Sequence, residues 1–117
     1  MSETCRICNA TKQEQILFTH IGASSPGELI SHEAAAAIVS WYLNANRGDL
    51  ITFVGDYDDP ESLPFYLTFS QLRDWPDRTD RIVRAMIDED ILEDHGKSYV
   101  DEEEPDVIYI RDLRLKR

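Results

Sequence analysis

Basic residues, long apolar runs and cysteine are all scarce in this chain of 117 residues. Twelve Lys and Arg stand against 23 Asp and Glu, so the formal net charge is −11. A field of that sign repels phosphate backbones and favours basic partners. No apolar run approaches the roughly 20 residues that cross a bilayer, and the N-terminus lacks the layout of a secretory signal. We therefore expect a soluble, cytoplasmic protein with no membrane partner.

Sequence motifs for catalysis and phosphate binding are also missing. Glycine occurs five times and never in the pattern of a phosphate-binding loop. No pair of carboxylates is embedded in an apolar stretch that would separate two pKa values, as acid–base catalysis requires. Acidic residues are abundant, but the D-x-D-x-D-G pattern of a calcium loop is absent. The sequence therefore predicts a protein that acts by binding and is not an enzyme.

The composition is sufficient for one folded domain. Hydrophobic residues make up 42% and aromatic residues 9% of the chain. That is enough to bury a core of the size usual for about 100–150 residues. Helical and strand-like patterns both occur, so we expect the α+β class. We divide the chain into an N-terminal Cys-x-x-Cys segment, residues 1–24, and a main domain, residues 25–117, which ends in a basic tail.

A helix is expected to start near residue 25. Ser25 can cap it, Pro26 suits the first helical position, and Glu28 completes a capping box with Ser25. Ser31 is a second candidate for the start, and Gly48 suits the left-handed conformation after the last turn. Apolar residues at helical spacing predict the buried face, with the tryptophan in the core: Ile30, Ala34, Ala37, Ile38, Trp41 and Ala45.

Three strands are expected around this helix. Residues 16–22 read as a short strand, and the apolar run 49–57 reads as a strand with both faces at least partly covered. After a loop at 58–64, bulky residues alternate over 65–69, which favours a strand that pairs back with the previous one.

Residues 70–100 predict two helices followed by a β-ribbon. Ser70 can cap a short helix, Pro76 cannot continue it, and Asp77 can cap a second helix. The apolar side of that second helix is predicted to be Ile82, Val83, Met86 and Ile87. The helix could run to Leu92 or end near Asp90. We favour the second ending, with strands at 91–93 and 97–100 joined by a turn at 94–96, and a further strand at 106–113.

The order of these elements resembles the winged helix-turn-helix superfamily over residues 31–112. The matching stretches are TFSQL for the entry of the second helix, DRTDRIVRAMIDEDIL for the recognition helix and LEDHGKSYV for the wing. Two departures are Asp90, where many members have glycine, and the longer loop DYDDPESLP. The resemblance implies a winged-helix-like fold and a transcription-related, DNA-binding regulator, which homodimer formation or a partner would assist.

This resemblance also implies a set of contact residues. Arginine side chains of the recognition helix would face the major groove, where they can form paired hydrogen bonds to guanine. Pairing with interleaved aspartates explains the same arginines equally well, and the expected wing is acidic where DNA readers are usually basic. The expected nucleic-acid-binding residues are Arg78, Thr79, Arg81 and Arg84 of the helix and Arg114, Lys116 and Arg117 of the tail.

The acidity supports a second hypothesis of another class. A protein-binding inhibitor or adaptor, of the kind that phages use to mimic nucleic acid, would place acidic loops in a basic groove of a partner protein. Simple solubility and adaptation to a salty cell explain the acidity as well. The candidate partner-binding residues are Asp58, Asp59, Glu61, Asp101, Glu102, Glu103 and Glu104.

The two cysteines, Cys5 and Cys8, have the spacing of a zinc knuckle. A structural zinc site needs four ligands, and His20 and His32 are the candidates for the other two. Free thiols in a reducing cytosol and a redox-active dithiol are the alternatives. Zinc is therefore the one cofactor that the sequence suggests.

Overall fold

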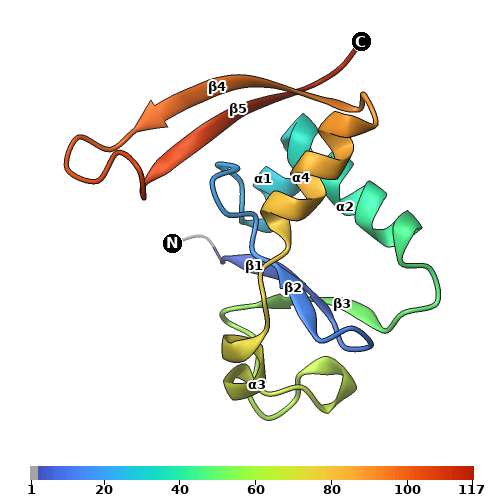
Figure 1. The fold of residues 1–117 in the computed structure, drawn as a ribbon. Coiled ribbons are helices and arrows are strands. Elements are labelled where there is room, and N and C mark those ends of the chain that lie inside the picture. Colours follow the sequence, from blue (N-terminus) through green and yellow to red (C-terminus); the bar gives the residue numbers. More distant parts are fainter. Residues whose placement is uncertain (1–2) are drawn as a thin grey trace.

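Two antiparallel sheets and several short helices make up the fold (Figure 1). The computed structural model describes residues 3–117. In chain order the elements are β1 (Cys5–Asn9), β2 (Glu14–Ile16), α1 (Pro26–Ser31), α2 (Glu33–Ala45), β3 (Ile51–Gly55), the 3-10 helix η1 (Pro64–Tyr66), α3 (Phe69–Asp74), α4 (Thr79–Asp88), β4 (Leu92–Val100) and β5 (Tyr109–Leu115).

The first sheet has three strands in the order β2-β1-β3. Ile7 in the middle of β1 lies opposite Ile16 on one side and Phe53 on the other. Side chains alternate along a strand, so Cys5 and Ile7 point to one face and Cys8 points to the other. Helices α1 and α2 cover the first face, and the segment of η1 and α3 covers the second.

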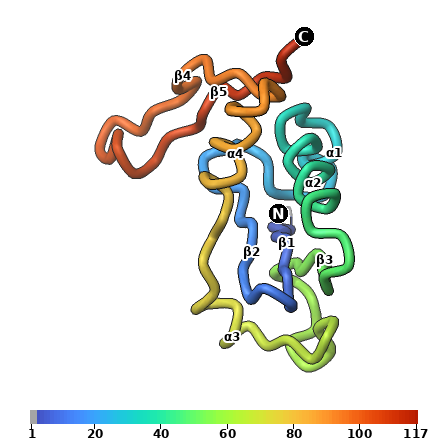
Figure 2. The backbone as a smooth tube through the Cα atoms, turned by 45° about the vertical axis from the view of Figure 1, so that its right-hand side comes forward, coloured from blue at the N-terminus to red at the C-terminus, as the bar shows by residue number. Residues whose placement is uncertain are grey.

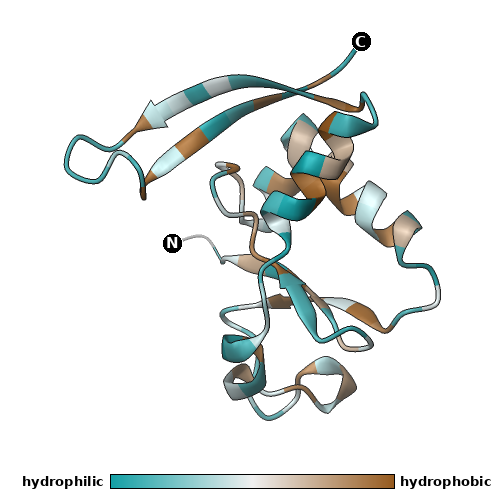
Figure 3. Ribbon diagram, in the orientation of Figure 1, coloured by the Kyte–Doolittle hydropathy of each residue, from teal (hydrophilic) through white to brown (hydrophobic). Residues whose placement is uncertain are grey.

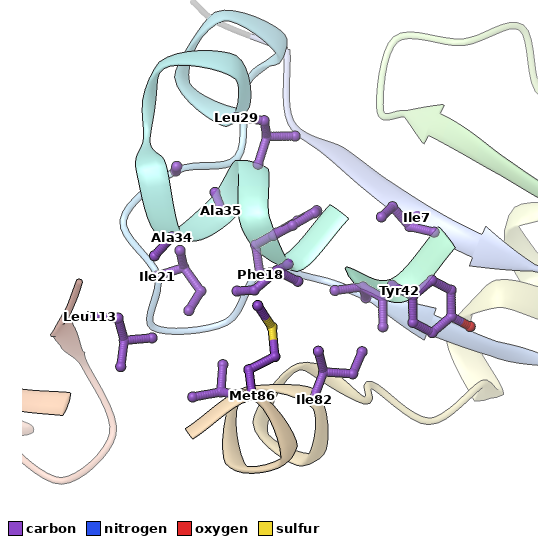
Figure 4. Close-up of a cluster of buried hydrophobic side chains, with 14 of the residues drawn as sticks. Ile7, Phe18, Ile21, Leu29, Ala34, Ala35, Tyr42, Ile82, Met86 and Leu113 are labelled. Carbon is purple, nitrogen blue, oxygen red and sulfur yellow. The ribbon is translucent and has the colours of Figure 1, made fainter. Parts of the chain in front are cut away.

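The larger hydrophobic core lies between α1, α2, α4 and the first face of the sheet. Met86 of α4 is fully buried and points toward Phe18 in Figure 4. Tyr42 of α2 and Leu113 of β5 belong to the same core, so the C-terminal ribbon is attached to it. Burial of each large side chain contributes about 2–3 kcal/mol, and this packing fixes where α4 and the ribbon lie.

The break between α3 and α4 confirms the effect predicted for Pro76. α3 ends at Asp74 and α4 begins at Thr79. Thr68, and not Ser70, caps α3, because its hydroxyl accepts the N–H of Gln71 in a complete capping box. The N-cap of α4 is Arg78 and not Asp77, but the carboxylate of Asp77 accepts the N–H of Thr79 at 3.0 Å, at the first residue of the helix.

The predicted end of α4 near Asp90 is also confirmed. The N–H of Asp90 donates to the carbonyl of Ile87, and the N–H of Ile91 donates to that of Met86. These two bonds form a Schellman motif, which requires a left-handed residue after the helix. Asp90 has a φ of 61°, so it occupies the conformation that glycine adopts most easily.

The ribbon β4–β5 follows α4, but its turn is not where the sequence placed it. Residues 94–96 were expected to reverse the chain, and they lie inside β4, which continues to Val100. Gly96 has a φ of 95°, and the register with β5 shifts there, so the DHG sequence makes an irregularity within the strand. The reversal comes at 101–108, and the ribbon projects from the body in both views (Figures 1 and 2).

Three other predictions, all for residues before 70, are wrong. Only Ile16 of residues 16–22 belongs to a strand, and residues 65–69 form η1 and the start of α3. The Ser25–Glu28 capping box is confirmed, but the helix breaks at His32. The buried residues of α2 are Ala34, Ala35, Ile38 and Tyr42, while Ile30 of α1 and Ala45 of α2 are exposed. Trp41 is only partly buried against the core.

The architecture is mixed α and β, compatible with the α+β class. β3 pairs with β1 and not with the ribbon, so the described residues contain two separate antiparallel sheets. α3 packs in the smaller core with Cys8 and Leu72, whereas α4 packs in the larger one. The winged-helix resemblance therefore stays one of element order. No helix within residues 3–117 has the length and apolarity to cross a membrane.

Candidate interaction surfaces

The helix α4 carries three of the residues predicted to contact nucleic acid, Thr79, Arg81 and Arg84, and Arg78 is its N-cap. Thr79 is buried at 2% exposure, and its hydroxyl accepts the N–H of Phe18 at 3.1 Å. Arg78 pairs with the half-buried Glu14 at 3.3 Å, and Arg84 pairs with Asp80 at 3.0 Å. Thr79 thus holds a loop in place, and the two arginines have protein partners.

The basic tail is paired in the same way. Arg114 pairs with Asp112 at 2.9 Å. Lys116 pairs with Asp90 at 3.0 Å, and Arg117 pairs with Glu33 at 2.6 Å. These three ion pairs are exposed, so solvent screens them and they add little to the stability of the fold. Their main effect is to cancel the positive charge on which the predicted phosphate contacts depend.

Arg81 is the predicted contact residue without an ion pair among the described residues. It lines a small cavity of about 330 Å³ between α2 and α4, together with Trp41 and Arg78. Trp41 donates its indole N–H to Glu89 at 2.7 Å. Glu14 also lines this cavity, so the positive charge of Arg78 is offset there.

The reversal between β4 and β5 gathers the densest negative charge. Five of the six residues 101–106 are acidic, and none is basic. A carboxylate oxygen of Asp101 accepts the N–H groups of Glu103 and Glu104 at 2.9 and 3.0 Å, which gives this tip an ordered turn. The side chains of Glu102, Glu103 and Glu104 are exposed.

Apolar side chains lie directly beside this acidic tip. Tyr99 and Val100 at the end of β4 are 51% and 42% exposed, and Val107 and Ile108 in the turn are 64% and 45% exposed. Figure 3 shows the hydrophilic tip and the hydrophobic residues next to it. We call residues 99–108 the acidic arm.

The base of the ribbon is held firmly to the body. Arg111 pairs with both Asp80 and Asp94, and its N–H donates to the carbonyl of His20 at 2.8 Å. The ring of His20 stacks on Tyr109 with 3.8 Å between centroids. The arm therefore extends from a fixed base, and none of its residues belongs to either hydrophobic core.

The second predicted acidic segment lies elsewhere. Asp58, Asp59 and Glu61 follow β3, on a different part of the molecule from the acidic arm (Figures 1 and 2). Asp58 accepts the N–H of Gly55 at 3.0 Å, and Asp59 accepts the N–H of Glu61 at 3.0 Å. The seven predicted partner-binding residues therefore form two surfaces and not one.

The four predicted zinc ligands do not converge. Cys5 belongs to the larger core and Cys8 to the smaller one, on opposite faces of β1. Desolvation by burial raises the pKa of Cys8 to about 11. His32 caps α2 by accepting the N–H of Ala35 at 3.1 Å, and His20 donates to Tyr109. Zinc binding by these residues stays a prediction; within residues 3–117 no group of three His, Cys, Asp or Glu forms a metal site.

A sequence pattern could have indicated the arm but not its apolar component. The acidic run 101–106 is visible in the sequence, whereas Tyr99 and Ile108 look like ordinary core residues of a strand.

Comparisons with models of protein families, with curated proteins and with solved structures find no match.

Proposed function

We propose that the protein is a non-enzymatic binding protein that attaches to a basic surface of a partner protein through the acidic arm. The observation that carries the proposal is the combination of exposed carboxylates and exposed apolar side chains on an arm with an anchored base. Carboxylates speed and orient the encounter with a basic surface, and buried apolar groups supply most of the affinity.

The arm is suited to this role because it is already ordered and so loses little conformational entropy on binding. Its base is fixed by Arg111 and by Leu113 in the core, and Asp101 orders the turn at the tip. A segment that is ordered before binding loses less conformational entropy when it binds. The four apolar side chains of the arm can then enter a cleft while the carboxylates contact its rim.

Nucleic-acid binding through α4 is the second candidate. Arg81 supports it, because this side chain is exposed beside a cavity and has no ion pair among the described residues. The ion pairs of Arg78 and Arg84 reduce the free positive charge around it. Phosphate contacts need such charge, so we rank this function second.

Charge neutralisation with a matched control tests the proposal. The arm variant carries Glu102→Gln, Glu103→Gln and Glu104→Gln, and the control carries Glu61→Gln, Asp74→Asn and Asp88→Asn. Both change the net charge equally, and all six residues are exposed. Egg-white lysozyme serves as a basic probe in calorimetric titrations at low and moderate salt. Three exposed ion pairs of about 0.5 kcal/mol each predict that the arm variant binds about tenfold more weakly than the control.

Equal weakening in the two variants would show that net charge alone attracts the probe, and it would overturn the proposal. Duplex DNA is titrated in parallel. Binding that falls steeply with salt and is lost in Arg81→Ala would favour the second candidate, because phosphate contacts release counterions.

A further inference from the structure

An apolar groove of about 530 Å³ lies between α1, α2 and the edge strand β3. Leu29 and Ile30 of α1, Val39 of α2 and Phe53 of β3 line it, with Cys5 of β1 among them. Ile30 is 80% exposed and Phe53 is 44% exposed, although both are large and apolar. We call this site the α1–β3 groove. Contiguous exposed apolar residues, unlike scattered ones, mark binding sites.

The groove opens beside a free sheet edge. In the order β2-β1-β3, the outer edge of β3 has no neighbouring strand within residues 3–117. The N–H of Asp56 donates to the carbonyl of Thr4, and this bond fixes the phase of the ladder between β3 and β1. Every second residue of β3 therefore bonds to β1, and the backbone N–H and C=O groups of Ile51 and Phe53 point away from it.

The protein covers part of this edge and leaves the middle open. Asp58 accepts the outward N–H of Gly55 at 3.0 Å, and the hydroxyl of Thr52 donates to the carbonyl of Phe53 at 3.1 Å. The N–H groups of Ile51 and Phe53 have no partner within the described residues. A strand that docks here can pair with these two residues.

A strand that pairs with the open edge of β3 would also place side chains in the groove. Phe53 lies directly opposite Ile7, and Gly55 lies opposite Cys5, so their side-chain positions share the face that α1 and α2 cover. A residue that pairs with Phe53 would place its own side chain on that face, inside the groove.

Three carboxylates, those of Glu3, Asp56 and Asp58, lie near Cys5 and Gly55, where β3 ends beside the groove. The thiol of Cys5 donates to Glu3 at 3.3 Å, and the carboxylate of Glu3 lies 2.5 Å from the position of a Cβ added to Gly55. Burial, followed by Glu3, Asp58 and Asp56, raises the pKa of Cys5 to about 11, as expected for negative charge gathered near it. A cation bound at this end would face these carboxylates.

We propose that the α1–β3 groove binds an extended segment of a partner protein, which adds to β3 as a new edge strand and carries a lysine or arginine two positions from an apolar residue. The apolar residue lies beside Phe53, and the basic one lies at Gly55 and Glu3, because every second residue of a strand shares a face. A second copy of this chain is a poor occupant, since each copy has a net charge of −11 and the two would repel each other. This site is separate from the acidic arm, so either proposal can fail alone.

The test uses synthetic peptides of about six residues, the usual length of a strand. The first is rich in threonine, with leucine in the centre and arginine two positions away. The second has glutamate in place of arginine, and the third is N-methylated on the backbone groups that would face β3. Each is titrated into isotopically labelled protein, and amide exchange is followed by NMR. The first peptide slows exchange at Ile51 and Phe53 about tenfold, the second binds about tenfold more weakly, and the third does not slow exchange.

Two matched variants localise the binding. Ile30→Ser removes an exposed wall of the groove, and Leu43→Ser removes a 43% exposed apolar residue of α2 that does not line it. Ile30→Ser weakens binding of the first peptide about threefold to tenfold, and Leu43→Ser leaves its affinity unchanged. The arm variant Glu102→Gln, Glu103→Gln and Glu104→Gln binds the peptide normally.

Three results would overturn the proposal. Equal binding of the N-methylated peptide would show a pocket for apolar groups without strand pairing. Equal binding of the glutamate peptide would show that the carboxylates have no role. Slow exchange at Phe53 that appears with protein concentration alone, together with dimers in sedimentation, would identify a second copy as the occupant.

Discussion

Replacement of Asp77 should destabilise the protein because this carboxylate joins the loop after β2 to the start of α4. It accepts hydrogen bonds from the hydroxyls of Thr19 and Thr79, both at 2.6 Å, and from the N–H groups of Leu17 and Thr79 at 3.1 and 3.0 Å. Hydrogen bonds to a charged group are stronger than neutral ones but are weakened by exposure, so Asp77→Ala should cost about 2–3 kcal/mol in all. For a domain of this size that lowers Tm by about 8–12 °C.

The same carboxylate gives a pH dependence. Burial alone would raise the pKa of Asp77, but the hydrogen bonds from Thr19, Thr79 and Leu17 outweigh it and lower the pKa below its ordinary value. A carboxyl with a lowered folded-state pKa stabilises the fold above its unfolded-state pKa, which is about 4. That stabilisation is lost as the pH falls from there through the lowered pKa.

Thermal unfolding at pH 7 and below pH 4 measures both effects. Asp77→Asn keeps one acceptor oxygen, so it should cost about half as much as Asp77→Ala and should flatten the acid dependence. Asp74→Ala, at an exposed position at the end of α3, is the control. A Tm for Asp77→Ala within about 2 °C of the unchanged protein would refute the reasoning, as would an unaltered acid dependence in Asp77→Asn.

Other predictions concern the core, the end of α4, the arm and the thiols. Met86→Ala should cost about 3–4 kcal/mol in chemical denaturation, because it leaves a cavity under α4. Asp90→Gly should stabilise the protein by up to about 1 kcal/mol, because glycine adopts the left-handed conformation more easily than aspartate. Loss of the exposed ion pair between Asp90 and Lys116 reduces this gain. Replacing residues 100–107 by a two-residue turn should leave Tm nearly unchanged, since those residues lie outside the core. Cys8 is fully buried, so it should react with a thiol reagent only after the protein unfolds. Metal analysis tests the predicted zinc ligands, and a content near one zinc per chain would support them.

Local chemistry explains why the sequence predicted the C-terminal half well. Proline cannot continue a helix, so Pro76 alone was enough to predict that α3 ends before α4 begins. Ile82, Val83 and Met86 repeat at helical spacing and are buried as expected, whereas Ile87, the fourth residue predicted for that side, is only partly buried. The turn of the ribbon was predicted too early, because Asp94-His95-Gly96 has the composition of a turn. Pairing with β5 keeps these three residues within β4.

The N-terminal half could not be predicted in the same way because it depends on distant partners. β1 is the central strand of its sheet and pairs both with β2 and with β3, which lies over 40 residues later. The Cys-x-x-Cys spacing drew attention to metal chemistry instead. The sequence also does not show that α2 turns Tyr42 toward the core and leaves Trp41 only partly buried. The α1–β3 groove is formed by three separate segments, so no local pattern could indicate it.

The ion pairs determine which charges remain for binding. Seven of the twelve basic side chains, from Lys12 to Arg117, form salt bridges with carboxylates. Because these pairs cancel locally, the net charge of −11 is carried by the acidic residues that remain, and they gather in the arm and at the end of β3. Both places adjoin exposed apolar side chains, Tyr99 and Val107 in one case and Phe53 in the other. Acidic charge beside apolar surface favours protein segments that are both basic and apolar, and it disfavours the bare phosphate backbone of nucleic acid.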